Sequence, residues 1–213
     1  MPKQYLPLGK KPVIAHSIQA FDSAPSVDVL VIAASREDHG LIVEEILKKY
    51  PPEKPWLLSD GGAVRQESVY NALSLPLQDA GIVSIHDGVR PLVTTEVIEA
   101  SIAAAKEWGA AVAGMPVKDT IKQVDGMDFA LSTPERSTLW LVQTPQTFKF
   151  ELIMKAHEAA LRDGFVGTDD SSLLERLGHK VKMIPGGYEN IKITTPDDII
   201  AAEQLLTARR GFK

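Results

Sequence analysis

Asp87 and Arg90 are the two residues of this chain whose types and spacing point most directly to chemistry. They stand in the segment His86-Asp87-Gly88-Val89-Arg90-Pro91, just after the apolar run at residues 81–85. An Asp carboxylate can ligate a hard cation such as Mg²⁺, and an Arg guanidinium can bond two phosphate oxygens at once. The pair suits a phosphorylated substrate, although a salt-bridged turn before a helix that begins at Pro91 would use the same residue types.

The apolar run at residues 81–85 decides where this pair would lie. It has the length and the β-branched content of a buried strand, so Asp87 and Arg90 should follow the carboxyl end of that strand. Open α/β sheets bind their ligands at this edge. The sequence therefore predicts a ligand site at residues 86–91.

A glycine pair, Gly61-Gly62, precedes a helical segment that carries Arg65 and Ser68. A turn of this kind exposes backbone N–H groups to an anion or to the edge of a base. Glycine pairs before helices are also ordinary turn chemistry, so this motif alone favours a structural role.

Two extended segments in the second half of the chain carry further polar groups. Gln143-Thr144-Pro145-Gln146 offers amides and a hydroxyl in a proline-stiffened stretch. In Asn190-Ile191-Lys192-Ile193-Thr194, an extended strand would place Asn190, Lys192 and Thr194 on one face and the isoleucines on the other. Lys192 would then either snorkel to the surface, which is the commoner case, or direct its charge into a site.

The elements that must position these residues alternate between strand and helix patterns. Strand patterns cover residues 27–33, 56–59, 81–85, 110–115 and 180–184, and helix patterns cover 13–21, 38–50, 64–75, 95–108, 150–162, 171–177 and 196–206. Apolar strands separated by helices are typical of a sheet that is covered on both faces. The expected fold class is α/β, a doubly wound and mostly parallel sheet in a single domain over residues 1–213.

Residues 118–141 break this rhythm. The segment 119–124 alternates in character, Asp125-Gly126 is a turn signal, and residues 129–132 could return as the partner strand. We interpret this region as a projecting β-arm. A two-stranded ribbon is only marginally stable alone, so we expect a second subunit to hold it; the alternative is a hairpin that lies on its own domain.

Composition excludes several classes of protein. The chain has 213 residues, 44% of them hydrophobic, a net charge of −5 and no cysteine. An acidic balance argues against nucleic acid as a partner, and the lack of cysteine excludes disulfides and thiolate zinc sites, which fits a reducing compartment. No apolar stretch approaches the roughly 20 residues that a membrane span needs, and we expect a cytoplasmic protein without a membrane partner.

Taken together, the motifs closely resemble those of the 2-C-methyl-D-erythritol 4-phosphate cytidylyltransferase family. The resemblance extends from Pro2 to about Leu206, with the motifs in the same order and at compatible spacing. The matching segments are Pro2-Lys3-Gln4-Tyr5, Gly61-Gly62 with Arg65 and Ser68, Asp87 with Arg90, Pro116-Val117-Lys118-Asp119-Thr120, Gln143-Thr144-Pro145-Gln146, Thr168-Asp169 and Asn190-Ile191-Lys192-Ile193-Thr194.

The resemblance implies a Rossmann-like nucleotidyltransferase domain whose arm completes a homodimer. It also implies a reaction of CTP with methylerythritol phosphate, in the presence of Mg²⁺, that gives a CDP-alcohol and pyrophosphate in non-mevalonate isoprenoid biosynthesis. Two alternatives remain open: a sister enzyme that uses ribitol 5-phosphate, and a non-catalytic dimeric binding protein. The segments Lys118-Asp119-Thr120-Ile121-Lys122 and Thr168-Asp169-Asp170-Ser171 favour the methylerythritol enzyme over its sister.

The resemblance also implies a role for each matching residue. Lys3 would neutralise charge on the attacked α-phosphate, and Lys192 with Arg136 would position methylerythritol phosphate, Arg136 reaching from the arm into the partner's site. Asp87 would face the metal and the ribose. The remaining substrate-binding residues would be Arg90, Thr120, Thr144, Thr168 and Thr194, and the nucleotide-binding residues Gly61, Gly62, Arg65, Ser68, Asp87 and Gly88.

Two features depart from the family pattern. Gly88 and Val89 stand where the family usually has two alanines. The family also has a first strand and a glycine-rich loop before the Pro2-Lys3-Gln4 segment, whereas this sequence begins at Met1. We interpret that beginning either as an internal methionine taken for the start or as a sequence that lacks its first residues, in preference to a natural enzyme without the loop. We expect a chain without the loop to bind CTP weakly, because the loop's N–H groups would wrap the triphosphate.

Overall fold

The structure, a computed structural model, describes residues 2–77 and 80–211, so Met1 lies outside it. Its largest sheet has four strands in the order β10-β6-β9-β5. These strands are β5 (Ile82–Ile85), β6 (Ala110–Pro116), β9 (Trp140–Lys149) and β10 (Lys182–Pro185). The strand β9 is antiparallel to both β5 and β6, and β10 is parallel to β6, so β5, β6 and β10 all end at one edge of the sheet.

A second, two-stranded sheet pairs β3 (Leu30–Ala34) with β4 (Trp56–Asp60) in parallel. The expected single sheet is therefore divided between β3 and β5 in the described part of the chain. Strands β3 and β5 line a cavity of about 770 Å³, together with apolar side chains of α1 (Val13–Asp22) such as Ile18 and Phe21.

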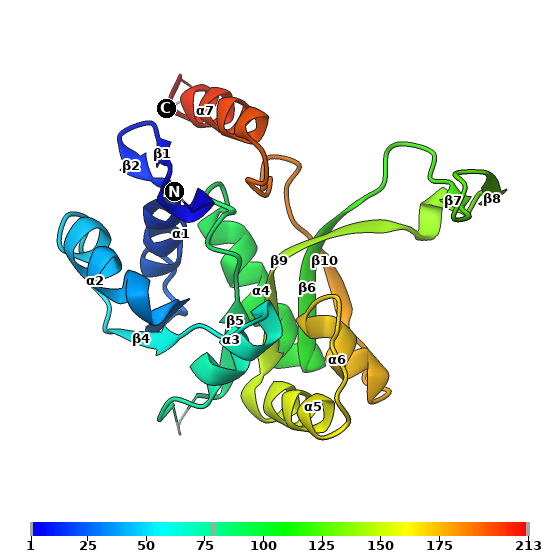
Figure 1. The fold of residues 1–213 in the computed structure, drawn as a ribbon, viewed down its shortest axis with the longest axis horizontal. Helices are drawn as coiled ribbons and strands as arrows, with labels where there is room; N and C mark the ends of the chain where they lie inside the picture. The colour runs from blue at the N-terminus through cyan, green and yellow to red at the C-terminus, as the bar shows by residue number, and fades with distance from the viewer. Residues whose placement is uncertain (1, 78–79, 212–213) are drawn as a thin grey trace.

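Helices cover both faces of the four-stranded sheet (Figure 1). The helix α4 (Thr95–Trp108) contacts all four strands on one face, while α5 (Phe150–Arg162) contacts β9 and packs against α3 (Arg65–Leu73) and α6 (Asp170–Arg176). Buried Phe148 of β9 packs with Leu73, Ile153 and Leu174 of these helices in one core cluster. This double covering is the α/β layering that the alternating patterns predict.

The arm projects from the body of the molecule, as Figure 1 shows at β7 and β8. Strands β7 (Gln123–Val124) and β8 (Ala130–Ser132) pair with each other in antiparallel fashion. The apolar side chains of Met127, Phe129 and Leu131, in and next to these strands, are between 61% and 75% exposed. The predicted hairpin is therefore present, and it does not lie on its own domain.

Several predicted elements differ in extent or type. The expected helix at 38–50 is a composite of η2 (Arg36–Asp38), α2 (His39–Leu41) and η3 (Ile42–Leu47). The strand β9 was not predicted, because Pro145 and the polar residues around it mask its β pattern. Residues 190–194 do not form a sheet strand. The backbone N–H of Ile193 donates to Val89 O, in the loop that follows β5. The remaining elements are η1 (Lys3–Tyr5), β1 (Pro7–Leu8), β2 (Lys11–Pro12), η4 (Arg136–Thr138) and α7 (Pro196–Gly211).

Within residues 2–77 and 80–211, none of the helices has both the length and the apolar content that crossing a membrane requires.

Candidate active site

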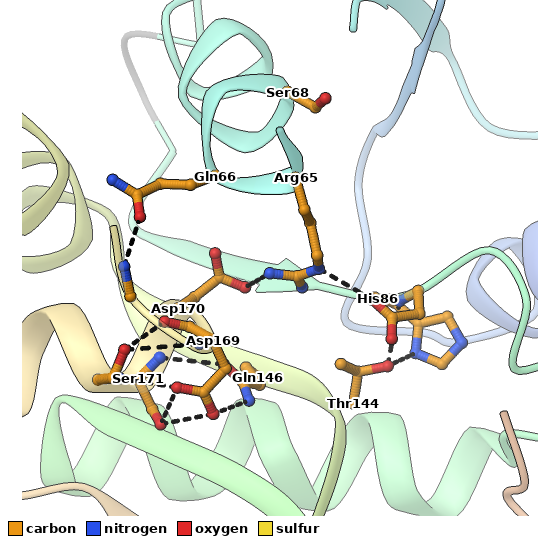
Figure 2. Close-up of polar contacts among 12 residues, drawn as sticks. Arg65, Gln66, Ser68, His86, Thr144, Gln146, Asp169, Asp170 and Ser171 are labelled. Atoms are coloured by element: carbon orange, nitrogen blue, oxygen red, sulfur yellow. Dashed lines mark hydrogen bonds and ion pairs between the residues drawn. The ribbon is translucent and has the colours of Figure 1, made fainter. Parts of the chain in front are cut away.

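The site is built at the edge of the sheet where β5 ends. Antiparallel pairing sets Ile85 opposite Gln146, so the next residues along β5 approach Thr144 on β9. The backbone N–H of Asp87 donates to Thr144 Oγ1 at 3.1 Å, and Thr144 Oγ1 lies 3.0 Å from His86 Nδ1. The antiparallel strand thus places Thr144 beside His86 (Figure 2) and beside the backbone of Asp87.

Three cations surround the Asp87 carboxylate. Lys192 Nζ lies 2.9 Å from Oδ2, Arg65 Nε donates to Oδ1 at 3.0 Å, and Arg90 Nε lies 3.8 Å from Oδ2. We call Asp87, Arg65, Arg90 and Lys192 the Asp87 cluster. Its members come from the end of β5, the start of α3 and the segment before α7, so the fold brings together residues that are more than 100 positions apart.

The electrostatics of the cluster follow from these contacts. Burial alone would raise the pKa of the Asp87 carboxyl, but the charges of Arg65 and Lys192 outweigh burial and hold that pKa below its ordinary value. Burial lowers the pKa of the His86 imidazole to about 4. At neutral pH the site therefore contains an ionised Asp87, three cations and a neutral histidine.

A second carboxylate, Asp170, holds Arg65 from the opposite side. Arg65 Nη1 lies 2.7 Å from Asp170 Oδ2, and the Asp170 side chain is only 1% exposed. Arg65 therefore bridges two carboxylates, as Figure 2 shows for its contact with Asp170. Buried His157 lies behind this pair, its Nε2 3.8 Å from Asp170 Oδ1.

The glycine turn before α3 is closed by its own hydrogen bonds. Gly62 N donates to Ser68 Oγ at 2.9 Å, and Gly61 N donates to Ala34 O at 2.6 Å. A Cβ at Gly61 would lie 3.1 Å from the Ala34 carbonyl carbon, so the close approach of this turn to β3 favours glycine there. The turn places Gly61, Gly62 and Ser68 at the end of α3 that also carries Arg65.

The start of α6 is tied to β9 and to α3. Asp169 is the N-cap of α6 and accepts from Ser172 N at 2.9 Å and from Gln146 Nε2 at 2.7 Å. Gln66 Oε1 accepts from Gly167 N at 2.9 Å (Figure 2). These bonds fix the segment that presents Asp170 to Arg65, and they leave the neighbouring Thr168 exposed.

The segment that carries Lys192 is fixed from β9 as well. Asn190 Nδ2 donates to Thr144 O at 2.8 Å, and Gln143 Nε2 donates to Gly187 O at 2.8 Å. Arg90 Nη1 donates to Asn190 O at 2.8 Å. The Gln143–Gln146 segment is thus a structural frame for the site, and two of its side chains hold neighbouring loops.

The structure does not bring all predicted site residues to the cluster. Lys3 is exposed in η1, and Arg136 lies on the arm, where its Nη1 donates to Lys118 O at 2.8 Å. Thr120 is exposed on the arm.

Thr194 helps to start α7, because its N–H and its hydroxyl both donate to Asp198 at 2.8 Å. Gly88 does lie within the turn of the cluster, where its carbonyl accepts from Ser17 Oγ at 3.2 Å.

Sequence reasoning did not assign a role to His86 or to Asp170, although both contact site residues. Asp170 carried a signal, since two adjacent acids before a helix are an N-cap pattern of which only one member caps. His86 stood inside the motif, but no spacing rule shows that its ring turns back to the carbonyl of Arg90.

Known proteins match this chain over nearly its whole length. The family model of 2-C-methyl-D-erythritol 4-phosphate cytidylyltransferase matches residues 1–208. A relative of that name from Caldanaerobacter subterraneus subsp. tengcongensis is 50% identical over 204 residues, which cover 96% of this chain and 90% of the relative. One from Syntrophotalea carbinolica is 48% identical over 213 residues, covering 99% and 91%.

Solved structures resemble the fold over nearly the whole chain. The 4-diphosphocytidyl-2C-methyl-D-erythritol synthase of Anaerococcus prevotii superposes with a TM-score of 0.89 at 31% identity, covering 97% of this chain and 90% of its own. The 2-C-methyl-D-erythritol 4-phosphate cytidylyltransferase of Thermus thermophilus superposes with a TM-score of 0.77 at 33% identity, covering 96% and 93%. These matches confirm the predicted nucleotidyltransferase-type α/β fold.

Proposed function

The chain belongs to the 2-C-methyl-D-erythritol 4-phosphate cytidylyltransferase family, and we propose that the Asp87 cluster is the place where its reaction occurs. In that reaction a phosphate oxygen of methylerythritol phosphate attacks the α-phosphorus of CTP. A new P–O bond forms, the bond between the α-phosphorus and the bridging oxygen breaks, and pyrophosphate leaves. The product is 4-diphosphocytidyl-2-C-methyl-D-erythritol.

The observation that carries this proposal is the charge of the Asp87 cluster together with its neighbour Asp170. Three cations, Arg65, Arg90 and Lys192, meet two carboxylates, Asp87 and Asp170, which leaves one positive charge in excess. The excess lies at the carboxyl edge of the sheet, where α/β folds bind ligands. A site of this kind favours an anion, and both substrates are phosphates.

The cations are also able to change partners. The Lys192 side chain is 43% exposed, so its ammonium can turn from Asp87 towards an arriving phosphate. Arg90 Nε is buried and has no hydrogen-bond partner among the described residues, which leaves one donor of that guanidinium unspent. Phosphoryl transfer depends mainly on positioning and on charge stabilisation, and these groups supply both without a covalent nucleophile.

Two further cations would complete the site. Lys3 would neutralise the α-phosphate, and Arg136 would position methylerythritol phosphate in the site of a partner subunit. The projecting arm supports a homodimer, because the exposed Met127, Phe129 and Leu131 have no cover in one chain and a second copy could bury them.

We propose Mg²⁺ as the divalent cation and Asp87 as its protein ligand. Described residues provide no group of three Asp, Glu or His side chains that could hold a metal alone. One carboxylate fits Mg²⁺ that arrives with the triphosphate, since Mg²⁺ is often bound by one or two carboxylates together with substrate phosphates. When bound, Mg²⁺ would neutralise charge on the phosphates of CTP. Each oxygen of Asp87 has one short contact, from Arg65 or from Lys192, so either oxygen keeps a lone pair that could take the metal.

We also propose that the enzyme works in the cytoplasm. Both substrates carry several negative charges and do not cross a lipid bilayer unaided, so an enzyme that joins them must act in the compartment that contains both.

The test is an assay of pyrophosphate release from CTP with Mg²⁺ and either methylerythritol phosphate or ribitol 5-phosphate. We expect product only with methylerythritol phosphate. Activity with ribitol 5-phosphate alone would assign the sister reaction instead. Omission of Mg²⁺ and its replacement by Ca²⁺ test the metal separately, and full activity without a divalent cation would contradict the proposed role of Asp87 as a ligand.

A further inference from the structure

His86 connects the two ends of the turn that carries Asp87 and Arg90. Its Nε2 lies 3.1 Å from Arg90 O, and its Nδ1 lies 3.0 Å from Thr144 Oγ1, which accepts from Asp87 N at 3.1 Å. The backbone bond from Arg90 N to Asp87 O, at 2.9 Å, closes the same turn. One imidazole is therefore tied to the backbone of both site residues, directly at Arg90 and through Thr144 at Asp87.

The direction of each bond in this chain is fixed by chemistry. The carbonyl of Arg90 can only accept, so His86 Nε2 must carry its hydrogen. Burial keeps His86 neutral at neutral pH, so with the hydrogen on Nε2 its Nδ1 can only accept. The hydroxyl of Thr144 therefore accepts from Asp87 N and gives its own hydrogen to His86 Nδ1. This arrangement is the one that a neutral imidazole with its hydrogen on Nε2 makes.

The surroundings of the ring hold it in this orientation. The centroid of Phe21 on α1 lies 5.1 Å from that of His86. Ser17 of the same helix donates from Oγ to Gly88 O at 3.2 Å, or to Arg90 O at 3.3 Å. The turn is thus clamped between α1 and β9, with the histidine inside the clamp.

We propose that His86 is a positioning residue for the reaction, which acts through Thr144 and the backbone of Arg90 to fix the Asp87 carboxylate. The proposal rests on the proposed function of the Asp87 cluster. Its physical basis is that the turn sets where the Asp87 carboxylate meets Lys192, at 2.9 Å, and Arg65, at 3.0 Å. Displacements of about 1 Å at a catalytic group can cost on the order of a hundredfold in rate.

Substitutions at His86 and Thr144, singly and together, test this chain of hydrogen bonds. Thr144→Val keeps the shape of the side chain but removes the hydroxyl, Thr144→Ser keeps the hydroxyl, and His86→Phe removes both nitrogens. We expect His86→Phe and Thr144→Val each to lower kcat at least tenfold with KM for CTP changed less than threefold, and Thr144→Ser to retain most of the kcat that Thr144→Val loses. The double variant should lose little more than the worse single variant, because both substitutions break one chain. Exposed His179→Phe serves as the control.

A second readout does not depend on activity. In ¹⁵N-labelled wild-type protein at neutral pH, the imidazole nitrogens of His86 should report an unprotonated Nδ1 and a protonated Nε2, and Thr144→Val should shift that tautomer balance. A wild-type His86 protonated on Nδ1, wild-type kcat in both single variants, or fully additive losses in the double variant would each overturn the proposal. If the wild-type protein released no pyrophosphate, the proposed function would fail, while the tautomer would still test the hydrogen-bond chain.

Discussion

Arg65 Nη1 lies 2.7 Å from Asp170 Oδ2, and this contact joins a carboxylate that is 1% exposed to a guanidinium side chain that is 38% exposed. The same guanidinium donates through Nε to Asp87 at 3.0 Å. A buried anion thus anchors a cation whose other side faces the site. Burial raises the pKa of the Asp170 carboxyl, and the positive charge of Arg65 opposes that rise.

Removing Arg65 should therefore cost stability as well as activity. Arg65→Met leaves Asp170 buried without its cation, and we expect the free energy of unfolding to fall by about 3 kcal/mol, the lower end of the range for broken buried pairs because Arg65 is partly exposed. Urea unfolding at pH 7 measures this loss.

The double variant Arg65→Met/Asp170→Leu separates the charge effect from lost packing. With both charges replaced by apolar groups, at least half of the lost stability should return, while activity stays low because Asp87 has still lost a partner. A double variant no more stable than Arg65→Met would show that the pair matters through its shape and not through its charge.

Lys192 and Lys3 should govern the chemical step. We expect Lys192→Ala and Lys3→Ala to lower kcat by about a hundredfold or more, with smaller changes in KM, because a preorganised cation acts on charge that develops in the transition state. Steady-state pyrophosphate release measures both constants. Lys155→Ala, an exposed substitution on α5, is the matched control and should behave as wild type. Near-normal turnover in both test variants would remove these lysines from the mechanism.

The sequence predicted the part of the site that follows one strand, and it did so for a physical reason. A run of apolar β-branched residues ends at Ile85, so the emergence of Asp87 and Arg90 at a sheet edge needs only local pattern. Contacts that depend on the register of β9 were beyond that reasoning. Pro145 and polar Gln143, Thr144 and Gln146 do not read as a strand, yet β9 lies centrally between β5 and β6.

Pairing across long sequence separations was equally hidden from the sequence. The sequence left two interpretations of Lys192 open: a lysine that snorkels to the surface, or a cation directed into a site. Only the fold shows that its ammonium lies 2.9 Å from Asp87. Asp170 had no assigned role, and only the fold shows that its side chain contacts Arg65 while its neighbour Asp169 caps α6. Lys3 and Arg136 rest on family resemblance alone, and their roles stay predictions.

His157 should make the fold sensitive to acid. Burial, together with the charge of Arg65, lowers the pKa of His157 to about 4, against about 6.5 in an unfolded chain. Between these values the unfolded state binds more protons than the folded state, so the free energy of unfolding falls as pH decreases from 6.5 towards 4. The full loss below pH 4 would be on the order of 3 kcal/mol for this group.

His157→Leu should remove this contribution. The free energy of unfolding of the wild type, minus that of the variant, should decrease steadily as pH falls from 7 to 4.5, because only the wild type has this proton to take up on unfolding. Urea unfolding at several pH values measures this difference. His86 is present in both proteins, so its similar effect cancels. Exposed His179→Leu is the control and should leave the pH dependence unchanged. Parallel curves for wild type and His157→Leu would contradict the lowered pKa.

Arg136 and Lys3 should complement each other between subunits if the site is shared. Arg136 lies on the projecting arm and Lys3 on the body, so a dimer of one Arg136→Ala subunit and one Lys3→Ala subunit would contain one site with both cations and one site with neither. After subunit exchange, half of the dimers should be mixed and half of their sites intact, which gives about a quarter of wild-type activity. Each variant alone should remain nearly inactive.

A second mixture provides the matched control for this exchange. Lys3→Ala and Lys192→Ala both alter the body of the subunit, so no hybrid site regains both lysines and the mixture should stay inactive. Subunit exchange is verified with two affinity tags before activity is compared. Recovery in the first mixture only would mean that the arm of one subunit completes the site of the other. Recovery in neither mixture, despite proven exchange, would place Arg136 outside the partner's site. In size-exclusion chromatography, elution as a monomer at every protein concentration would exclude the dimer itself.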